Sequence, residues 1–171
     1  WFTLLDDLQF NDQGIPKLDA GAVLQRNTRY SWAYLCKQVK TTPPPATTAP
    51  DGIELTVVVY DRRPELPGST GSLPNEIVLT GNFIAGQSYV DVTYTAGNKP
   101  AVNKGTWILD ATANGTVKNG YFYRVASAED GPTANSLRLA LTQPVRDSSG
   151  VNGVCVVMQN VAEVFEKGIR K

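Results

Sequence analysis

Short runs of alternating apolar and polar residues, separated by turn-forming residues, recur along this chain with a spacing of about ten residues. The clearest run is RYSWAYLCKQVK, residues 29–40. Residues two apart in a strand point to the same side, so one face of this run carries Tyr30, Trp32, Tyr34 and Cys36. We therefore predict a β-strand with an aromatic face at this position.

The run IELTVVVYDRR, residues 53–63, has the strongest strand signal in the chain. It is rich in β-branched residues, and its apolar character is nearly continuous, which is typical of a strand covered on both faces. Residues 41–52, TTPPPATTAPDG, favour an extended and exposed conformation because three prolines follow one another. We expect this connection to join two paired strands, and residues 64–76 to form a second long loop.

Further strand-like runs continue to the end of the chain. They lie at residues 77–86, 87–97, 105–112, 121–130 and 136–145, and at 154–171, which begins as a strand and ends in a short extension. Eight or so strands with turn signals between them, and no alternation with helices, indicate an all-β chain. The predicted fold is mainly β, with an antiparallel sheet folded as a barrel or a sandwich.

The start of the chain has a different pattern. In WFTLLDDLQF the apolar residues Trp1, Leu4, Leu5 and Leu8 have helical spacing and predict a short N-terminal helix. A loop follows, because Asn, Asp, Gly and Pro cluster after it. We divide the chain into residues 1–28, the helix with its connecting loop, and residues 29–171, the β-rich domain, and expect both to fold as one unit.

The stretch KGTWILDATANGTVKNGYFYRV, residues 104–125, predicts two strands around a turn region with two Asn-Gly dipeptides. Its aromatic residues Trp107, Tyr121 and Tyr123 have two interpretations. They pair across a hairpin in the core, which is a common way to stabilise two strands. Alternatively, they form a platform on which a sugar or a base stacks. The first interpretation is favoured.

The composition excludes several classes of site. The sequence has no histidine, which removes the usual general base near neutral pH and the commonest metal ligand. Catalysis by Ser-His-Asp or Cys-His groups is therefore excluded within this chain. The 16 basic residues balance the 16 acidic residues, so the chain lacks the positive field that nucleic-acid binding requires. We expect no cofactor, no metal and no nucleic-acid partner.

The acidic residues do not form a recognisable catalytic pair. Asp6, Asp7 and Asp12 lie close in sequence and offer oxygens to a calcium ion, but their spacing does not match an EF-hand loop. A solvated loop is the simpler interpretation. Asp110 follows an apolar strand, where a carboxylate commonly accepts hydrogen bonds from a turn. We expect a protein that is not an enzyme.

The two cysteines, Cys36 and Cys155, are far apart in the sequence, and each lies in an apolar run. The first interpretation is two buried free thiols, because free cysteine is among the most buried residue types. The alternative is a disulfide between an early and a late strand in an oxidising compartment. No CxxC pair is present, so a metal knuckle is not supported.

Several phrases together resemble a group of bacterial prepilin-like proteins, related to type IV pilins and type II secretion pseudopilins. They are RYSWAYLCKQV, LTVVVYDRRP, KPAVNKGTWILDAT, GYFYRVAS and VAEVFEKG, and the resemblance covers most of residues 29–168. Members of the group carry a prepilin cleavage and methylation motif, one apolar helix and then a β-rich exported domain. The resemblance implies a cell-envelope location, periplasmic or extracellular, with membrane attachment through an apolar helix upstream of this sequence. It carries over no catalytic residue.

The resemblance implies a non-enzymatic structural subunit of a secretion or filament assembly. Its partners would be other pilin-like subunits or components of the secretion machinery, and residues 1–8 would be the last turns of the apolar helix, where it packs on the sheet. The alternative is an exported binding module. It would recognise a carbohydrate or a protein through the aromatic hairpin and the loops at residues 41–52 and 64–76.

Overall fold

The computed structural model describes residues 10–18, 30–39, 52–61, 76–114, 117–150 and 152–170, and these residues form strands and turns without a helix. The strands are β1 (Tyr30–Val39), β2 (Gly52–Asp61), β3 (Ile77–Asn82), β4 (Tyr89–Thr93), β5 (Trp107–Asp110), β6 (Ala113–Asn114), β7 (Val117–Lys118), β8 (Tyr121–Asp130), β9 (Ser136–Leu141), β10 (Gly153–Val157) and β11 (Val161–Arg170). The prediction of a mainly β fold is confirmed.

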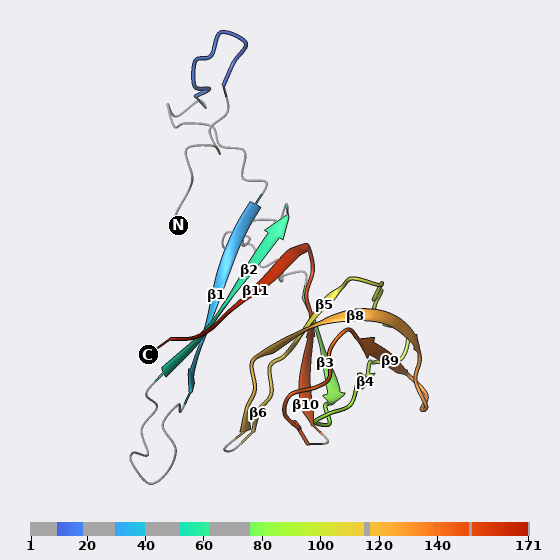
Figure 1. The fold of residues 1–171 in the computed structure, drawn as a ribbon. Helices are drawn as coiled ribbons and strands as arrows, with labels where there is room; N and C mark the ends of the chain where they lie inside the picture. Colours follow the sequence, from blue (N-terminus) through green and yellow to red (C-terminus); the bar gives the residue numbers. More distant parts are fainter. Residues whose placement is uncertain are drawn as a thin grey trace.

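Six of the strands close into an antiparallel barrel in the order β10-β3-β4-β9-β8-β5 (Figure 1). The barrel closes because β10 pairs with β3 along one edge and with β5 along the other. Between β5 and β8 the chain makes the short β6–β7 hairpin. Of the two predicted alternatives, a barrel or a sandwich, these strands form the barrel, and residues 104–125 form a hairpin, as the sequence indicates.

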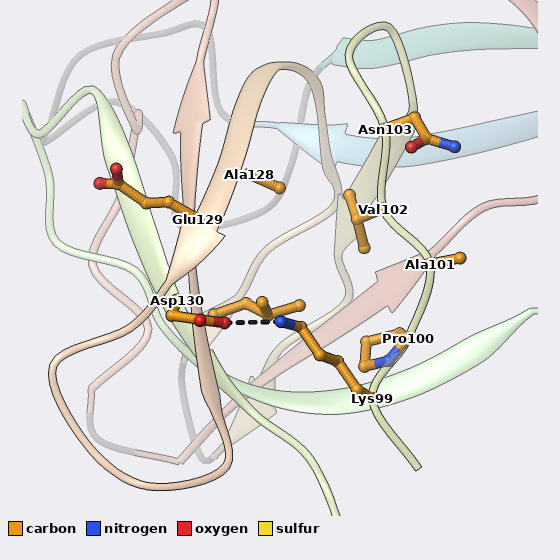
Figure 2. Close-up of a pocket in the computed structure, with 9 residues that line it drawn as sticks. Lys99, Pro100, Ala101, Val102, Asn103, Ala128, Glu129 and Asp130 are labelled. Carbon is orange, nitrogen blue, oxygen red and sulfur yellow. Dashed lines mark hydrogen bonds and ion pairs between the residues drawn. The ribbon is translucent and has the colours of Figure 1, made fainter.

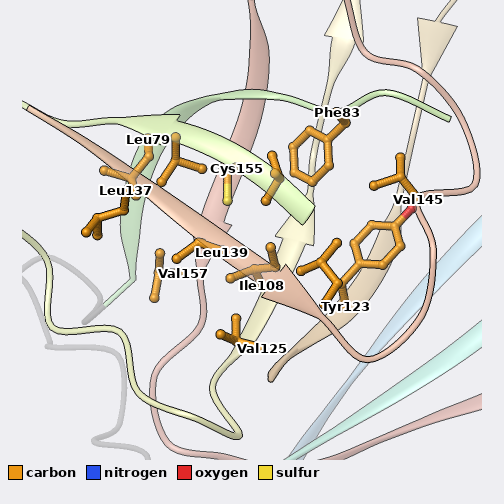
Figure 3. Close-up of a cluster of buried hydrophobic side chains, with 13 residues drawn as sticks. Leu79, Phe83, Ile108, Tyr123, Val125, Leu137, Leu139, Val145, Cys155 and Val157 are labelled. Atoms are coloured by element: carbon orange, nitrogen blue, oxygen red, sulfur yellow. The ribbon is translucent and has the colours of Figure 1, made fainter. Parts of the chain in front are cut away.

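The barrel interior is filled by side chains that alternate inward along its strands (Figure 3). The buried cluster consists of Leu79, Phe83, Val90, Val92, Ile108, Tyr123, Val125, Leu137, Leu139, Leu141, Val145, Cys155 and Val157. Branched aliphatic residues dominate it, as strand propensity and dense packing both favour. The interior is therefore a packed core.

The remaining long strands form a separate three-stranded sheet in the order β1-β2-β11, which packs against the outside of the barrel (Figure 1). β1 and β2 pair along ten residues without interruption, which confirms the predicted pairing. A second buried cluster joins the sheet to the barrel: Val58, Tyr60, Phe122 and Met158, with Leu35, Trp107, Leu109, Val156, Val161 and Val164 packed against them. We call the side of the sheet that contacts the barrel the inner face.

The predicted N-terminal helix at residues 1–10 is not shown, because residues 1–9 lie outside the described part. Residues 10–18 form a turn closed by a bridge between Phe10 and Pro16. The Asn11 side-chain oxygen accepts hydrogen bonds from the backbone N–H groups of Gln13 and Ile15, which agrees with the predicted loop. Among the described residues there is no apolar helix of membrane-spanning length. The connections at 41–51 and 64–75 also lie outside the described part.

Candidate functional site

Tyr123, one of the three aromatic candidates, lies inside the barrel. Its side chain is fully buried and stacks on Phe83 with 6.0 Å between the ring centroids. Its hydroxyl accepts a hydrogen bond of 3.0 Å from the backbone N–H of Arg146. Burial raises the pKa of Tyr123 to about 12. Tyr123 is thus a core residue whose ring is closed to a ligand.

Trp107 lies on the opposite side of the same hairpin. The β5–β8 register places Trp107 opposite Arg124 and Ile108 opposite Tyr123, so Trp107 points out of the barrel while Tyr123 points in. The indole packs under the three-stranded sheet. The Arg124 guanidinium lies 5.9 Å from the centre of the ring system. Trp107 and Tyr123 therefore do not share one binding platform.

Tyr121 is half-buried and joins the sheet to the barrel. Its hydroxyl accepts a hydrogen bond of 2.6 Å from Lys37 Nζ of β1 and donates one of 2.5 Å to Asp147. Lys37 Nζ also lies 3.8 Å from the centre of the ring. Burial, followed by the hydrogen bond to Asp147, raises the pKa of Tyr121. The hydroxyl of Tyr121 thus both accepts and donates a hydrogen bond within the chain.

Arg146 makes a second polar link between the two layers. Its guanidinium forms ion pairs with Glu54 of β2, at 3.2 Å, and with Glu166 of β11. It also lies 5.2 Å from the centre of the Tyr121 ring. Together with the Lys37–Tyr121–Asp147 chain, this arrangement fixes the inner face of the sheet at the end of the barrel.

The two cysteines lie on different parts of the fold, and both are free thiols. Cys155 is fully buried in the barrel core, and burial raises the pKa of its thiol. Cys36 is exposed on the sheet. The prediction that both thiols are buried is therefore wrong for Cys36, and the alternative disulfide is absent from the structure.

The most distinctive surface is the side of the three-stranded sheet that faces away from the barrel. Cross-strand partners share a face, so the register places Tyr34, Val57 and Phe165 in one row on this side. We call this surface the outer face. Its apolar residues are Trp32, Tyr34 and Cys36 of β1, Ile53, Leu55, Val57 and Val59 of β2, and Phe165 of β11.

The outer face is open to solvent across all three strands. Tyr34 is 57% exposed, Ile53 49% and Phe165 45%. The near-continuous apolar run of β2 predicts a strand covered on both faces. Among the described residues only the inner face is covered, so the cover that the sequence pattern predicts for the outer face is not shown by them.

The sequence anticipated part of this surface. The alternation in residues 29–40 correctly predicts that Trp32, Tyr34 and Cys36 share one face. Phe165 was missed, because the end of the chain reads as a short extension and in fact forms the ten-residue strand β11. The run VAEVFEK gives no clear strand signal, because its apolar residues stand in adjacent pairs instead of alternating with the charged ones.

A hollow of about 550 Å³ lies between residues 99–103 and the ends of β8 and β9 (Figure 2). The ion pair between Lys99 Nζ and Asp130, 2.6 Å long, crosses it. Both side chains are more than half exposed, so solvent screens the pair. The hollow therefore lacks the buried polar group of a built binding site.

Within the described residues, no group of three or more acidic or cysteine side chains is placed to hold a metal ion. Asp110 is the buried carboxylate, and it accepts hydrogen bonds from the Thr112 backbone N–H, the Thr112 hydroxyl and the Asn119 amide. This confirms its predicted role as an acceptor in a turn. Asp6 and Asp7 lie outside the described residues, and Asp12 is exposed.

Comparison with known proteins adds no further constraint. No protein-family model matches the chain, and no curated protein or solved structure does either. Among the surfaces of the described residues, the outer face is the strongest candidate site.

Proposed function

We propose that the chain is a non-enzymatic structural subunit, pilin- or pseudopilin-like, of a secretion or filament assembly at the cell envelope. The observation that carries the proposal is the outer face. Its eight apolar side chains form a contiguous patch with no described element over it. Contiguous apolar patches of this kind mark contacts with proteins or membranes.

An apolar helix is the cover that fits this surface best. The central ridge of β2, from Ile53 to Val59, is about 20 Å long at the usual rise of a strand. A helix of about 13 residues has the same length. Each Å² of apolar surface that such a helix removes from water contributes about 25 cal/mol to association. The sequence resemblance supplies such a helix upstream of the β-rich domain.

The contacts of the inner face support the same role. The sheet is fixed on the barrel by the apolar cluster around Val58, Tyr60 and Phe122, and by the two polar links through Tyr121 and Arg146. The outer face is thus presented on a supported layer. A subunit that transmits load within an assembly needs such a layer, and it needs no chemistry of its own. Other pilin-like subunits or components of the secretion machinery would be its partners.

The mature N-terminus of the native protein tests this proposal. Mass spectrometry of isolated envelopes is expected to find a methylated N-terminal residue followed by about twenty apolar residues ahead of Trp1, the length that a spanning helix requires. A conventional signal-peptidase cut directly before Trp1, with the protein recovered free of the membrane, would refute a pilin-like subunit.

A second candidate is an exported binding module, and the exposed rings of Tyr34 and Phe165 are the observation that favours it. Stacking of sugars on these rings requires the outer face to stay open in the native protein. Retention on immobilised glycans, lost in Tyr34→Ala and Phe165→Ala, would support this module. Absence of retention with every glycan tested leaves the structural subunit as the proposal.

A further inference from the structure

The two edges of the three-stranded sheet differ sharply in how they are protected. β1 forms one edge, and it pairs with β2 through ten consecutive residues without a bulge. On its other side no strand is present among the described residues. An edge strand turns part of its backbone N–H and C=O groups away from its neighbour, which makes it a template for another strand.

The opposite edge, β11, carries the features that prevent such pairing. Its register with β2 shifts twice, between Val161 and Glu163 and between Glu166 and Ile169. Gly168 has a φ of 69°, outside the strand conformation. Three charged residues lie between Val161 and Ile169. Bulges and charges are the usual protection of an edge strand.

β1 lacks these protections. Its only charged residue is Lys37, and the lysine side chain turns to the inner face, where it donates to the Tyr121 hydroxyl. The outer-face residues Trp32, Tyr34 and Cys36 carry no charge. β1 is thus a long, regular and largely apolar edge strand.

We propose that β1 pairs antiparallel with β1 of a second copy across a two-fold axis, which joins two three-stranded sheets into one continuous sheet. The proposal does not depend on the pilin-like identity. With a two-fold axis perpendicular to the sheet, the outer faces of both copies lie on the same side of the joined sheet. Residues that lie opposite each other must therefore come from the same face, so an even-numbered residue of β1 lies opposite an even-numbered one and an odd-numbered residue opposite an odd-numbered one. The registers with the greatest overlap are centred on Tyr34 or on Leu35, and each overlaps over nine residues.

The sequence of β1 is complementary to itself in both registers. With Tyr34 on the axis, Trp32 lies opposite Cys36 of the second copy, and Lys37 lies opposite Ser31. With Leu35 on the axis, Tyr34 lies opposite Cys36, and Lys37 lies opposite Ala33. No like charges meet in either case, and aromatic cross-strand neighbours stabilise antiparallel pairs. Because β1 meets no like charge when it pairs with itself, a second copy of this chain is the partner that fits the β1 edge.

The barrel leaves this edge accessible. β1 is the end strand of its sheet, and the barrel strands pair with one another and not with β1. Contacts from the barrel side reach β1 through the inner-face residues Leu35 and Lys37. Pairing of two β1 strands would also join the two outer faces into one wider apolar surface.

Analytical ultracentrifugation of the 171-residue chain tests the proposal, with Tyr34→Lys and Phe165→Lys as a matched pair. Both residues are exposed on the outer face, but only Tyr34 belongs to the β1 edge. We expect a dimer whose dissociation constant rises at least about tenfold in Tyr34→Lys, because the two-fold axis places two new lysines close together. We expect Phe165→Lys to leave the constant within about twofold of the original.

Cysteine cross-linking tests the register without weakening the strand. Trp32→Cys forms a disulfide with Cys36 of the second copy only in the Tyr34-centred register, and Tyr34→Cys does so only in the Leu35-centred register. Directly opposite residues meet the spacing that a disulfide requires. Formation of one of the two covalent dimers under mild oxidation supports the proposal.

Three results would overturn the pairing. They are a monomeric chain at all accessible concentrations, a dimer that Phe165→Lys dissolves and Tyr34→Lys does not, and no cross-link from either cysteine variant. The second result would assign self-association to the outer face instead of the β1 edge. Circular dichroism of each variant checks that the strands are retained.

Discussion

Replacing Tyr123 by alanine is expected to lower the free energy of unfolding by about 3–5 kcal/mol, the usual cost of removing a large aromatic side chain from a core. The ring is fully buried against Phe83, and its hydroxyl accepts from the Arg146 backbone N–H. Urea denaturation followed by circular dichroism measures the loss. A loss below about 1 kcal/mol would contradict a core role and revive the aromatic platform.

Tyr123→Phe is the matched control, because it keeps the ring and removes only the hydroxyl. We expect it to lower stability by about 1 kcal/mol, the net value of one hydrogen bond. It also gives a pH signature. Because burial raises the pKa of Tyr123 from 10 to about 12, the folded state holds a proton that the unfolded state loses. This contribution is complete below pH 10 and is lost as the pH rises toward 12. The difference in stability between the original protein and Tyr123→Phe should therefore change over that window.

Replacing Asp110 by alanine is expected to cost about 3 kcal/mol, because it leaves buried donors without an acceptor. The carboxylate accepts from Thr112 N at 3.1 Å, Thr112 Oγ1 at 2.5 Å and Asn119 Nδ2 at 2.8 Å. The Thr112 hydroxyl in turn accepts from the Val154 N–H of β10 at 3.0 Å. Asp110 thus links both ends of the β6–β7 hairpin to the barrel.

Asp110→Asn is the matched control, because it removes the charge of the side chain and keeps its shape. The amide keeps one acceptor oxygen but places an N–H₂ group opposite a donor. We therefore expect Asp110→Asn to lower the free energy of unfolding, but by less than Asp110→Ala does. Chemical unfolding gives the energies, and amide exchange of residues 111–120 shows whether the hairpin loosens first. Equal stability of Asp110→Ala and the original protein would show that this hydrogen-bond network is dispensable.

The alternating pattern of this sequence predicts most of the strands of the fold. The alternation in residues 29–40 identifies β1 and its faces, and the Asn-Gly turns identify the hairpin of β5 and β8. Both signals are local, since the period and turn chemistry of a strand do not depend on distant parts of the chain. The choice of a closed barrel with a separate sheet is not local. It depends on β10 pairing with both β3 and β5, which are distant in sequence.

The candidate site was only partly predictable for the same reason. The sequence shows three aromatic residues in this hairpin, Trp107, Tyr121 and Tyr123. Only the strand register decides that Trp107 points under the sheet and Tyr123 into the barrel. The open outer face could not be read from β2, because an apolar run looks the same whether its second face is covered by the chain or by a partner. The outer face is a candidate contact surface for this reason.

Cys36 provides a direct measurement of whether the outer face is covered in the native protein. Its thiol is exposed at that face, whereas Cys155 is buried in the barrel. Maleimide labelling followed by mass spectrometry compares the isolated 171-residue chain with the full-length protein in intact envelopes. The proposed subunit predicts that Cys36 reacts readily in the isolated chain and far more slowly in the envelope, while Cys155 reacts only after denaturation. Equal labelling of Cys36 in both preparations would contradict a covered outer face, and with it the proposed role as an assembly subunit.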